Sequence, residues 1–159
     1  MSSLNHSAKK KKLVFITSRF PYPLEKGDKL RAFYQIKYLS AFFEITLLAL
    51  SEKKVKHEDF KQLSAFCSSI QVFEIKKWQK YIGVFQGLFN EKPFQVNYFY
   101  HRSIQKKILS TLTEVQPDHI FCQLLRTSEY AKHYHNCPKT IDYMDALSLG
   151  MERRVETES

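Results

Sequence analysis

The sequence predicts an α/β domain with a Rossmann-like, doubly wound and mainly parallel sheet that carries helices on both faces. Short apolar runs rich in β-branched residues alternate along the chain with segments whose apolar residues recur at helical spacing. Strands that alternate with helices pair in parallel through right-handed crossovers. The chain has 159 residues, of which 43% are apolar and 26% are charged. This composition supports one hydrophobic core and excludes intrinsic disorder.

The start of the chain carries the clearest pattern. Residues 12–18 (KLVFITS) are predicted to form a buried strand, and the proline-containing loop that follows must be extended. Asp28 is the expected N-cap of an amphipathic helix that begins after this loop. Residues 44–50 (EITLLAL) form the second predicted strand, so residues 12–50 make a β-α-β unit.

The alternation of strands and helices continues along the rest of the chain. Helices are predicted where apolar residues recur every three or four positions, and strands where short β-favouring runs occur. The further elements are expected in the order helix 57–68, strand 70–75, helix 78–89, helix 104–115, strand 118–123, helix 128–135 and strand 139–143.

The chain divides into a flexible basic tail, residues 1–11, and one domain, residues 12–159. The last predicted strand is followed by a stretch without a closing element, as expected for the N-terminal domain of a longer, two-domain chain. Three cysteines without paired spacing are typical of a reduced cytosolic protein, and no apolar run is long enough for a transmembrane helix. We therefore expect a cytoplasmic protein.

Positive charge dominates the sequence. Lys and Arg number 25 against 16 Asp and Glu, which gives a net charge of +9, and residues 9–12 are all lysine. A basic surface favours anionic partners such as phosphorylated substrates or an anionic membrane surface, with the protein peripheral at the inner face. Nucleic acid is disfavoured because no recognised nucleic-acid motif accompanies the charge. The charge alone also fits a solvated surface.

The loop after the first strand is the first candidate site, because ligands of parallel α/β sheets bind beyond the carboxyl ends of the strands. Gly27 allows a ligand to approach the backbone closely, and the helix that follows presents free N–H groups to an anion. Lys26, Lys29 and Arg31 surround this point with positive charge. The arrangement fits a phosphate or a polyhydroxylated substrate. The alternative is a plain connecting loop in which Gly27 has a positive φ angle and the basic side chains are solvated.

Two further candidate positions follow later strands. Arg126 comes after strand 118–123, where it can clamp a carboxylate or phosphate or form a surface ion pair. Asp142 and Asp145 lie at the end of the last predicted strand. Asp145 is the candidate catalytic residue, since a carboxylate at a strand tip can act as a base or orient a hydroxyl. The alternative role of Asp145 is to cap the following helix.

No metal site and no resident cofactor are predicted. His133, His135 and Cys137 have H-x-H-x-C spacing, but no fourth ligand accompanies them. Cys67 and Cys122 lie on predicted apolar faces and are expected in the core. The loop after the first strand has neither the P-loop nor the GxGxxG glycine spacing, so the sequence does not favour ordinary ATPase or dinucleotide chemistry.

Several of these segments together resemble a known enzyme family. The segments are TSRFPYPLEKGDKLRAFYQIKYLS followed by EITLLAL, and later PDHIFCQLLR and TIDYMDALSLGMERR. They are similar in order and spacing to the opening domain of GT-B glycosyltransferases of the group-one (family-four) class. The similarity is greatest to the branch associated with exopolysaccharide and PEP-CTERM/exosortase systems, and it covers most of residues 12–156.

The resemblance implies the N-terminal, acceptor-side domain of a retaining, metal-independent sugar transferase. Such an enzyme uses a nucleotide sugar as co-substrate and a saccharide or lipid-linked molecule as acceptor. By the resemblance, transfer takes place in a cleft between this domain and a C-terminal domain. The C-terminal domain holds most of the donor and carries the family's carboxylate motif. By this resemblance Gly27 lies near the donor phosphates, and Asp28 replaces its usual partner glycine. Asp145 takes the acidic position of the family's His-Asp pair, and Met144 stands in place of the histidine.

A function from a different class stays open on the sequence alone. A non-catalytic Rossmann-like module that binds phosphate or polyanions would carry the same basic loop. If the chain belongs to an enzyme, the residues expected to bind substrate are Lys26, Gly27, Asp28, Lys29, Arg31, Arg126 and Asp142. The isolated chain is then expected to be inactive, because the reacting groups of a cleft enzyme come from both domains.

Overall fold

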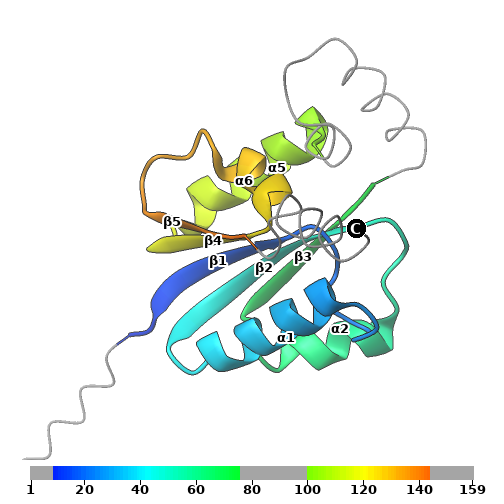
Figure 1. Cartoon of the computed structure of the whole chain (residues 1–159). Coiled ribbons are helices and arrows are strands. Elements are labelled where there is room, and N and C mark those ends of the chain that lie inside the picture. The colour runs from blue at the N-terminus through cyan, green and yellow to red at the C-terminus, as the bar shows by residue number, and fades with distance from the viewer. Residues whose placement is uncertain (1–8, 76–99, 144–159) are drawn as a thin grey trace, which may run out of the picture.

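The computed structural model describes residues 9–75 and 100–143 of the chain. Strands and helices alternate through both described ranges (Figure 1). In chain order the elements are β1 (Lys11–Thr17), α1 (Gly27–Leu39), β2 (Phe43–Ser51), α2 (His57–Ser64), β3 (Ser69–Glu74), α5 (Arg102–Val115), β4 (His119–Gln123), α6 (Leu125–Ala131) and β5 (Lys139–Asp142).

The described strands form one five-stranded, all-parallel sheet in the order β3-β2-β1-β4-β5. Leu13 of β1 lies opposite Ile45 of β2 on one side and His119 of β4 on the other, so β1 is the central strand. Chain order runs outward from β1 in both directions, which makes the gap between β1 and β4 the topological switch point of the sheet. The predicted α/β fold class is confirmed.

Helices cover both faces of the sheet (Figure 1). Leu13 and Phe15 of β1 pack with Ala32 and Ile36 of α1 on one face. Val14 and Ile16 point to the other face and pack with residues of α5 and α6, because neighbouring side chains of a strand alternate between faces. A continuous apolar run such as that of β1 is therefore buried on both sides, as is usual for parallel strands.

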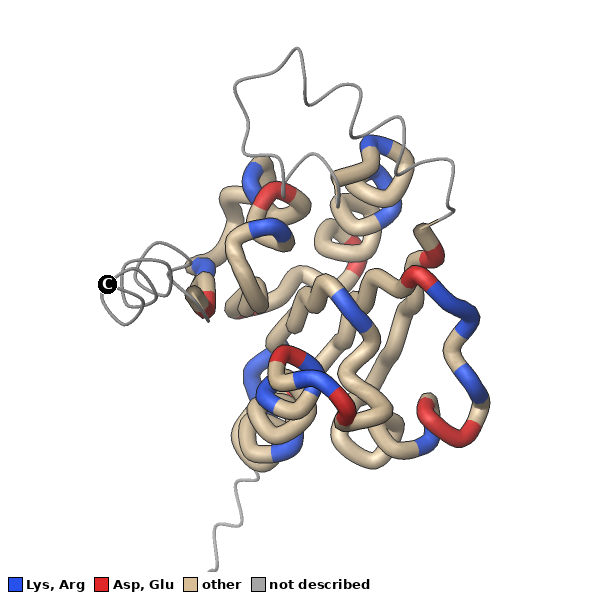
Figure 2. Tube along the Cα trace, turned by 45° about the vertical axis from the view of Figure 1, so that its right-hand side comes forward, with Lys and Arg blue, Asp and Glu red and all other residues tan. Residues whose placement is uncertain are grey.

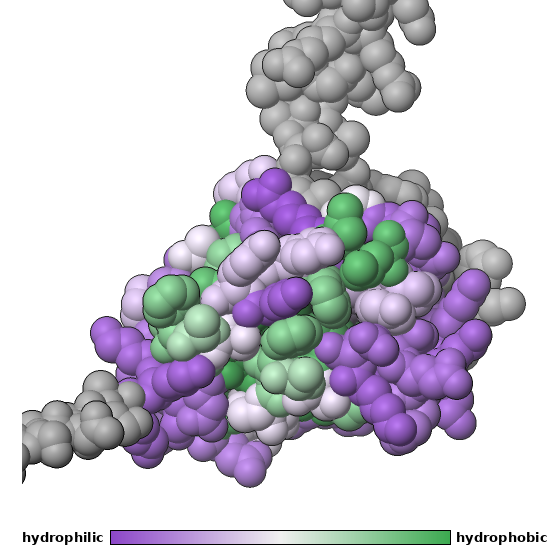
Figure 3. All heavy atoms as spheres, turned by 90° about the horizontal axis from the view of Figure 1, so that it is seen from below, coloured by the Kyte–Doolittle hydropathy of each residue, from purple (hydrophilic) through white to green (hydrophobic). Residues whose placement is uncertain are grey.

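The outer surface of α1 and the turn after it is less polar than a helix surface usually is. Leu30, Tyr34, Tyr38 and Phe42 are all exposed, and the rings of Tyr34 and Tyr38 stack with centroids 6.3 Å apart. Figure 3 shows the molecule from below, and hydrophobic side chains gather in the middle of that face between groups of hydrophilic side chains. No helix of the described ranges is long and apolar enough to cross a bilayer.

Several predicted boundaries are wrong, among them the end of α6, which lies at Ala131 and not at residue 135. The N-cap of α1 is Lys26 and not Asp28, and no side chain caps this helix. Helix α2 ends at Ser64, four residues before the predicted end, and α6 begins at Leu125, three residues before the predicted start. The predicted helix 78–89 lies outside the described residues.

The early start of α6 has a local cause. Leu124, between β4 and α6, has φ 69° and ψ 148°, a backbone conformation that leucine seldom adopts. This conformation turns the chain directly from strand into helix, and the Leu124 N–H donates a 3.0 Å hydrogen bond to the Asp142 carbonyl of the neighbouring strand. Strain of this kind costs about 1–3 kcal/mol and is concentrated at functional sites.

Candidate functional site

The carboxyl ends of the parallel strands meet at one edge of the sheet, and charged side chains gather there. Three segments form this edge: the loop between β1 and α1, the loop between β2 and α2, and the start of α6. Figure 2 shows basic residues along the β2–α2 loop and acidic residues at both of its ends. Ligands of open α/β sheets bind at this edge, next to the switch point.

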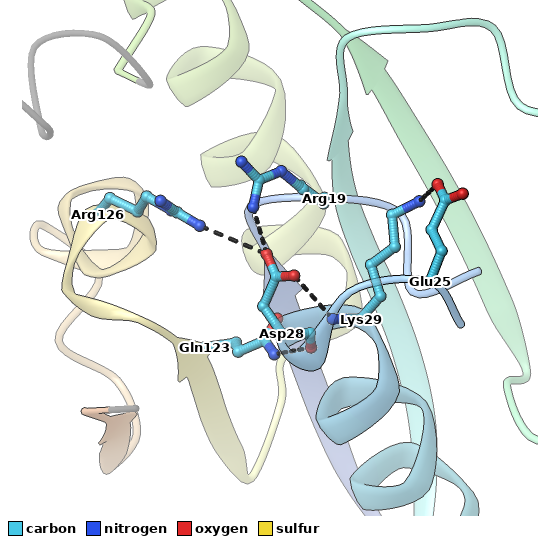
Figure 4. A network of polar contacts seen from close by, with 6 residues as sticks. All are labelled: Arg19, Glu25, Asp28, Lys29, Gln123 and Arg126. Atoms are coloured by element: carbon cyan, nitrogen blue, oxygen red, sulfur yellow. Dashed lines mark hydrogen bonds and ion pairs between the residues drawn. The ribbon is translucent and has the colours of Figure 1, made fainter. Parts of the chain in front are cut away.

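Asp28 lies at the centre of a charged network beside the switch point (Figure 4). Its Oδ2 accepts a hydrogen bond from Arg19 Nη1 at 2.5 Å and lies 3.6 Å from Arg126 Nη2. Only 11% of the Asp28 side chain is exposed. Two guanidinium groups therefore approach one carboxylate, and the negative charge of Glu52 also acts on Arg126.

A second contact ties the network to the sheet. Gln123, the last residue of β4, donates from Nε2 to the main-chain carbonyl of Asp28 at 2.6 Å (Figure 4). The end of β4 and the start of α1 are thus held together on either side of the switch point. Arg19 and Gln123 are not among the predicted site residues. Gln123 ends β4 and Arg19 follows the end of β1 by two residues, and this position after a buried strand is the signal that could have identified them.

The Arg126 guanidinium is an unusual cation, because its side chain is only 15% exposed. Burial lowers the pKa of Arg126, and the neighbouring charge of Arg19 lowers it further, while Asp28 and Glu52 act in the opposite direction. Arginine remains cationic at neutral pH despite such shifts. A partly desolvated, planar cation at a sheet edge is suited to bidentate recognition of a phosphate or carboxylate.

The loops after β1 and β2 border an open pocket of about 480 Å³ next to this network. Six basic and three acidic side chains line it, together with apolar side chains that include Phe20 and Val55. The basic residues of the lining are Arg19, Lys26, Lys29, Lys53, Lys54 and Lys56. Lys26 and Lys29 were predicted from the first loop, whereas the lysines of the second loop were missed.

Gly27 lies at the first position of α1, and its conformation excludes one of the predicted alternatives. No glycine of the described residues has a positive φ angle, so the interpretation of Gly27 as a left-handed loop residue is wrong. A Cβ added at Gly27 would meet no atom within 4 Å. The first turn of α1 is therefore open to a ligand at this point.

Arg31 and Asp142 lie together, away from the pocket lining. Arg31 donates from Nε and Nη2 to the two Asp142 carboxylate oxygens, both at 2.9 Å, and Gln35 Nε2 donates to Asp142 Oδ2 at 2.9 Å. The Asp142 side chain is only 10% exposed. This bidentate pair fastens α1 to the edge strand β5.

The remaining candidate residues divide between the core and the part of the chain that is not described. Asp145 lies outside the described residues. Cys122 is buried in the core as predicted, whereas Cys67 is only partly buried against it, and burial raises the pKa of both thiols to about 12. No group of three or more His, Cys, Asp or Glu side chains within residues 9–75 and 100–143 is arranged to hold a metal ion.

Comparisons with known proteins extend the description of the fold. No protein-family model and no curated protein matches this sequence. Among solved structures, the chain is similar to Phytolacca americana UGT2, a GT-B glycosyltransferase, in complex with UDP-2-fluoroglucose and pterostilbene. The TM-score is 0.52 at 15% sequence identity, and the match covers 94% of this chain but only 35% of that chain. The chain thus has an α/β fold like that of one domain of a GT-B glycosyltransferase.

Proposed function

We propose that this chain is the acceptor-side domain of a GT-B glycosyltransferase, which transfers a sugar from a nucleotide-sugar donor to a saccharide or lipid-linked acceptor. The observation that carries the proposal is the likeness in fold to a GT-B glycosyltransferase over 94% of the chain, together with a basic pocket at the carboxyl edge of the sheet. Phytolacca UGT2 binds UDP-2-fluoroglucose and pterostilbene in its complex, which are a nucleotide sugar and a second small molecule.

The charge at the switch point supports a phosphate-bearing donor. Arg19 and Arg126 both approach the carboxylate of Asp28, and the Arg126 side chain is only 15% exposed. A diphosphate placed beside the two guanidinium groups would accept paired hydrogen bonds from their planar N–H donors. We place the donor diphosphate on this side of the cleft, with Gly27 leaving room for its approach.

A second domain is required for the reaction. The chain spans 35% of the UGT2 chain, and transfer in a cleft needs groups from both walls. Correct positioning of two reactants contributes about 7–11 kcal/mol of barrier lowering. We therefore propose that the isolated chain does not transfer sugar, and that a C-terminal domain supplies most of the donor contacts.

The finer features of the reaction are also part of the proposal. We propose a retaining, metal-independent transfer in envelope or exopolysaccharide synthesis, with Asp145 as the catalytic carboxylate. The anomeric configuration of the product, followed by NMR, tests retention, and transfer in the presence of EDTA tests independence from metals. Asp145→Asn in the two-domain protein should lower kcat, whereas a change in melting temperature alone would favour the helix-cap role.

An anionic membrane surface is the partner proposed for the outer face of α1. Exposed Tyr38 and Phe42 lie at and just after the end of α1, and Lys10 Nζ donates to the Ser40 carbonyl at 2.6 Å, which brings Lys10 to the same place. Aromatic side chains beside lysines favour the interface of anionic bilayers. Sedimentation with anionic vesicles should fall with added salt and after removal of residues 1–12, and equal binding to neutral vesicles would contradict this.

Arg126 offers a direct test of the proposed donor site. In the two-domain protein, Arg126→Gln should lower kcat/KM for the nucleotide sugar by about tenfold or more, which corresponds to one lost charge-assisted contact. Arg102→Gln, which removes an exposed arginine at the start of α5, is the matched control and should leave kcat/KM unchanged. If both variants transfer sugar as the parent does, the donor does not bind beside Arg126.

A further inference from the structure

Resting on the proposed function, we propose that the pocket between the β1–α1 and β2–α2 loops binds the phosphate group of a phosphorylated acceptor. This pocket is separate from the contact between Asp28 and Arg126, and Arg19 borders both. An acceptor held here lies next to the place that we assign to the donor diphosphate.

The first argument is the set of lysines without partners. Among the described residues, the side chains of Lys26, Lys53, Lys54 and Lys56 take part in no hydrogen bond or ion pair, although all four line one pocket. Lys29 differs, because its Nζ donates to Glu25 at 3.2 Å. Six basic side chains and three carboxylates line the cavity, so its lining has a net positive charge that a bound dianion would neutralise.

The second argument is the position of two of these lysines. Lys26 is the N-cap of α1 and Lys56 is the N-cap of α2, and neither helix has a side-chain cap. Lysine is a poor choice at this position, because the helix dipole places partial positive charge there and the N–H groups need an acceptor. The sequence breaks the same local rule at two helices that open into one pocket, which is typical of a binding site.

The third argument is the shape of the pocket. A volume of about 480 Å³ is within the range of small-molecule sites. Phe20 and Val55 supply apolar surface, and Phe20 is itself held by stacking on Phe60 with ring centroids 6.4 Å apart. Ser51 Oγ donates to the Lys53 carbonyl at 2.6 Å, which fixes the turn that carries the lysines. Cationic and apolar surface together fit a phosphate ester rather than a free inorganic ion.

The test uses the 159-residue chain with one ligand pair that differs only in the phosphate and with a third ligand that adds acyl chains. Binding of sn-glycerol 3-phosphate, of monomeric dihexanoyl phosphatidic acid and of glycerol is followed by ¹H–¹⁵N NMR. Both phosphates should shift the amides of residues 51–56, and glycerol should not. Tighter binding of the lipid phosphate indicates a lipid-borne acceptor, and equal binding indicates a soluble phosphate ester.

Charge-matched variants separate the pocket from general attraction to a basic protein. Combined Lys53→Gln, Lys54→Gln and Lys56→Gln should weaken binding of sn-glycerol 3-phosphate by about tenfold or more. The control variant removes the same charge from exposed helical positions by combining Lys37→Gln, Lys106→Gln and Lys107→Gln. Its affinity for sn-glycerol 3-phosphate should change less than about threefold. Equal weakening in the two variants, or shifts absent from residues 51–56, would overturn the proposal. Because no sugar transfer is measured, this result is independent of the outcome for the proposed glycosyltransferase activity.

Discussion

Replacing Asp28 by Asn removes the charge that the Arg19 and Arg126 guanidinium groups share, while the volume of the side chain stays nearly the same. Asp28 Oδ2 lies 2.5 Å from Arg19 Nη1 and 3.6 Å from Arg126 Nη2, and the Asp28 side chain is 11% exposed. The variant removes the negative charge that both of these partly buried cations approach. We expect Asp28→Asn to destabilise the fold.

The size of the effect follows from the contacts. A hydrogen bond to a charged partner contributes about 1.5–3 kcal/mol, and an acidic residue in the first turn of a helix adds about 0.3–1 kcal/mol. Arg19 is 32% exposed, so water compensates for part of the loss. We expect the free energy of unfolding to fall by about 2 kcal/mol, which lowers the melting temperature by about 4–8 °C in a domain of this size.

The assay is thermal unfolding of the 159-residue chain followed by circular dichroism. Glu25→Gln is the matched control, because it removes the exposed carboxylate that pairs with Lys29 at i,i+4 spacing, close to Asp28 in the sequence. That pair should contribute less than about 1 kcal/mol. If Asp28→Asn and Glu25→Gln melt at the same temperature as the parent chain, the guanidinium groups do not depend on Asp28 and our description of the network is incorrect.

Three further predictions concern other parts of the fold. Gly27→Ala should leave the free energy of unfolding unchanged or raise it by about 0.4–1 kcal/mol, because the new Cβ meets open space. The melting temperature should therefore stay the same or rise, and a clear decrease would contradict this. Asp142→Asn should weaken the contacts with Arg31 and Gln35 and speed amide hydrogen exchange in β5, measured by mass spectrometry, whereas unchanged exchange would refute that role. Burial lowers the pKa of His101 from 6.5, so stability should be retained above pH 6.5 and decrease below it. His101→Gln should flatten the dependence of the melting temperature on pH. If the melting temperatures of the variant and the parent fall equally steeply below pH 6.5, this prediction is wrong.

The fold was predictable because its strongest signals are local. Leu13 to Ile16 form an apolar run that a parallel sheet buries on both faces, and the alternation with helical segments defines the fold class. The start of α6 was missed because it depends on Leu124 at φ 69°, which no residue preference of leucine predicts. Only contacts made in the folded chain can hold a leucine in that conformation.

The candidate site was predictable in part. The rule that ligands bind at the carboxyl ends of parallel strands indicated the region of Lys26, Asp28 and Arg126, which the structure places along one edge of the sheet. The pairing of Asp28 with Arg126 joins elements far apart in the sequence, so no spacing pattern reveals it. The same strand-end rule, applied to β2, would have indicated Lys53 and its neighbours.

Arg31 shows a different limit of sequence reasoning. The sequence predicts that Arg31 adds positive charge to the site around Gly27. Arg31 instead lies within α1, four residues before Gln35, and the side chains of both residues donate hydrogen bonds to Asp142. Residues four apart share one face of a helix, so the spacing fixes that face. Which element that face contacts depends on the order of the strands, and the sequence does not contain that order in any short pattern.

The most direct test of the proposed glycosyltransferase is a transfer assay with the protein encoded by the whole reading frame that contains this sequence. Radiolabelled nucleotide sugars are offered with membrane lipid extract and with soluble saccharides, and labelled product is measured. The account predicts transfer by the whole protein, loss of most of it with Arg126→Gln, and no transfer by the 159-residue chain alone, because positioning by two domains supplies about 7–11 kcal/mol. Transfer by the isolated chain at the rate of the whole protein would contradict it.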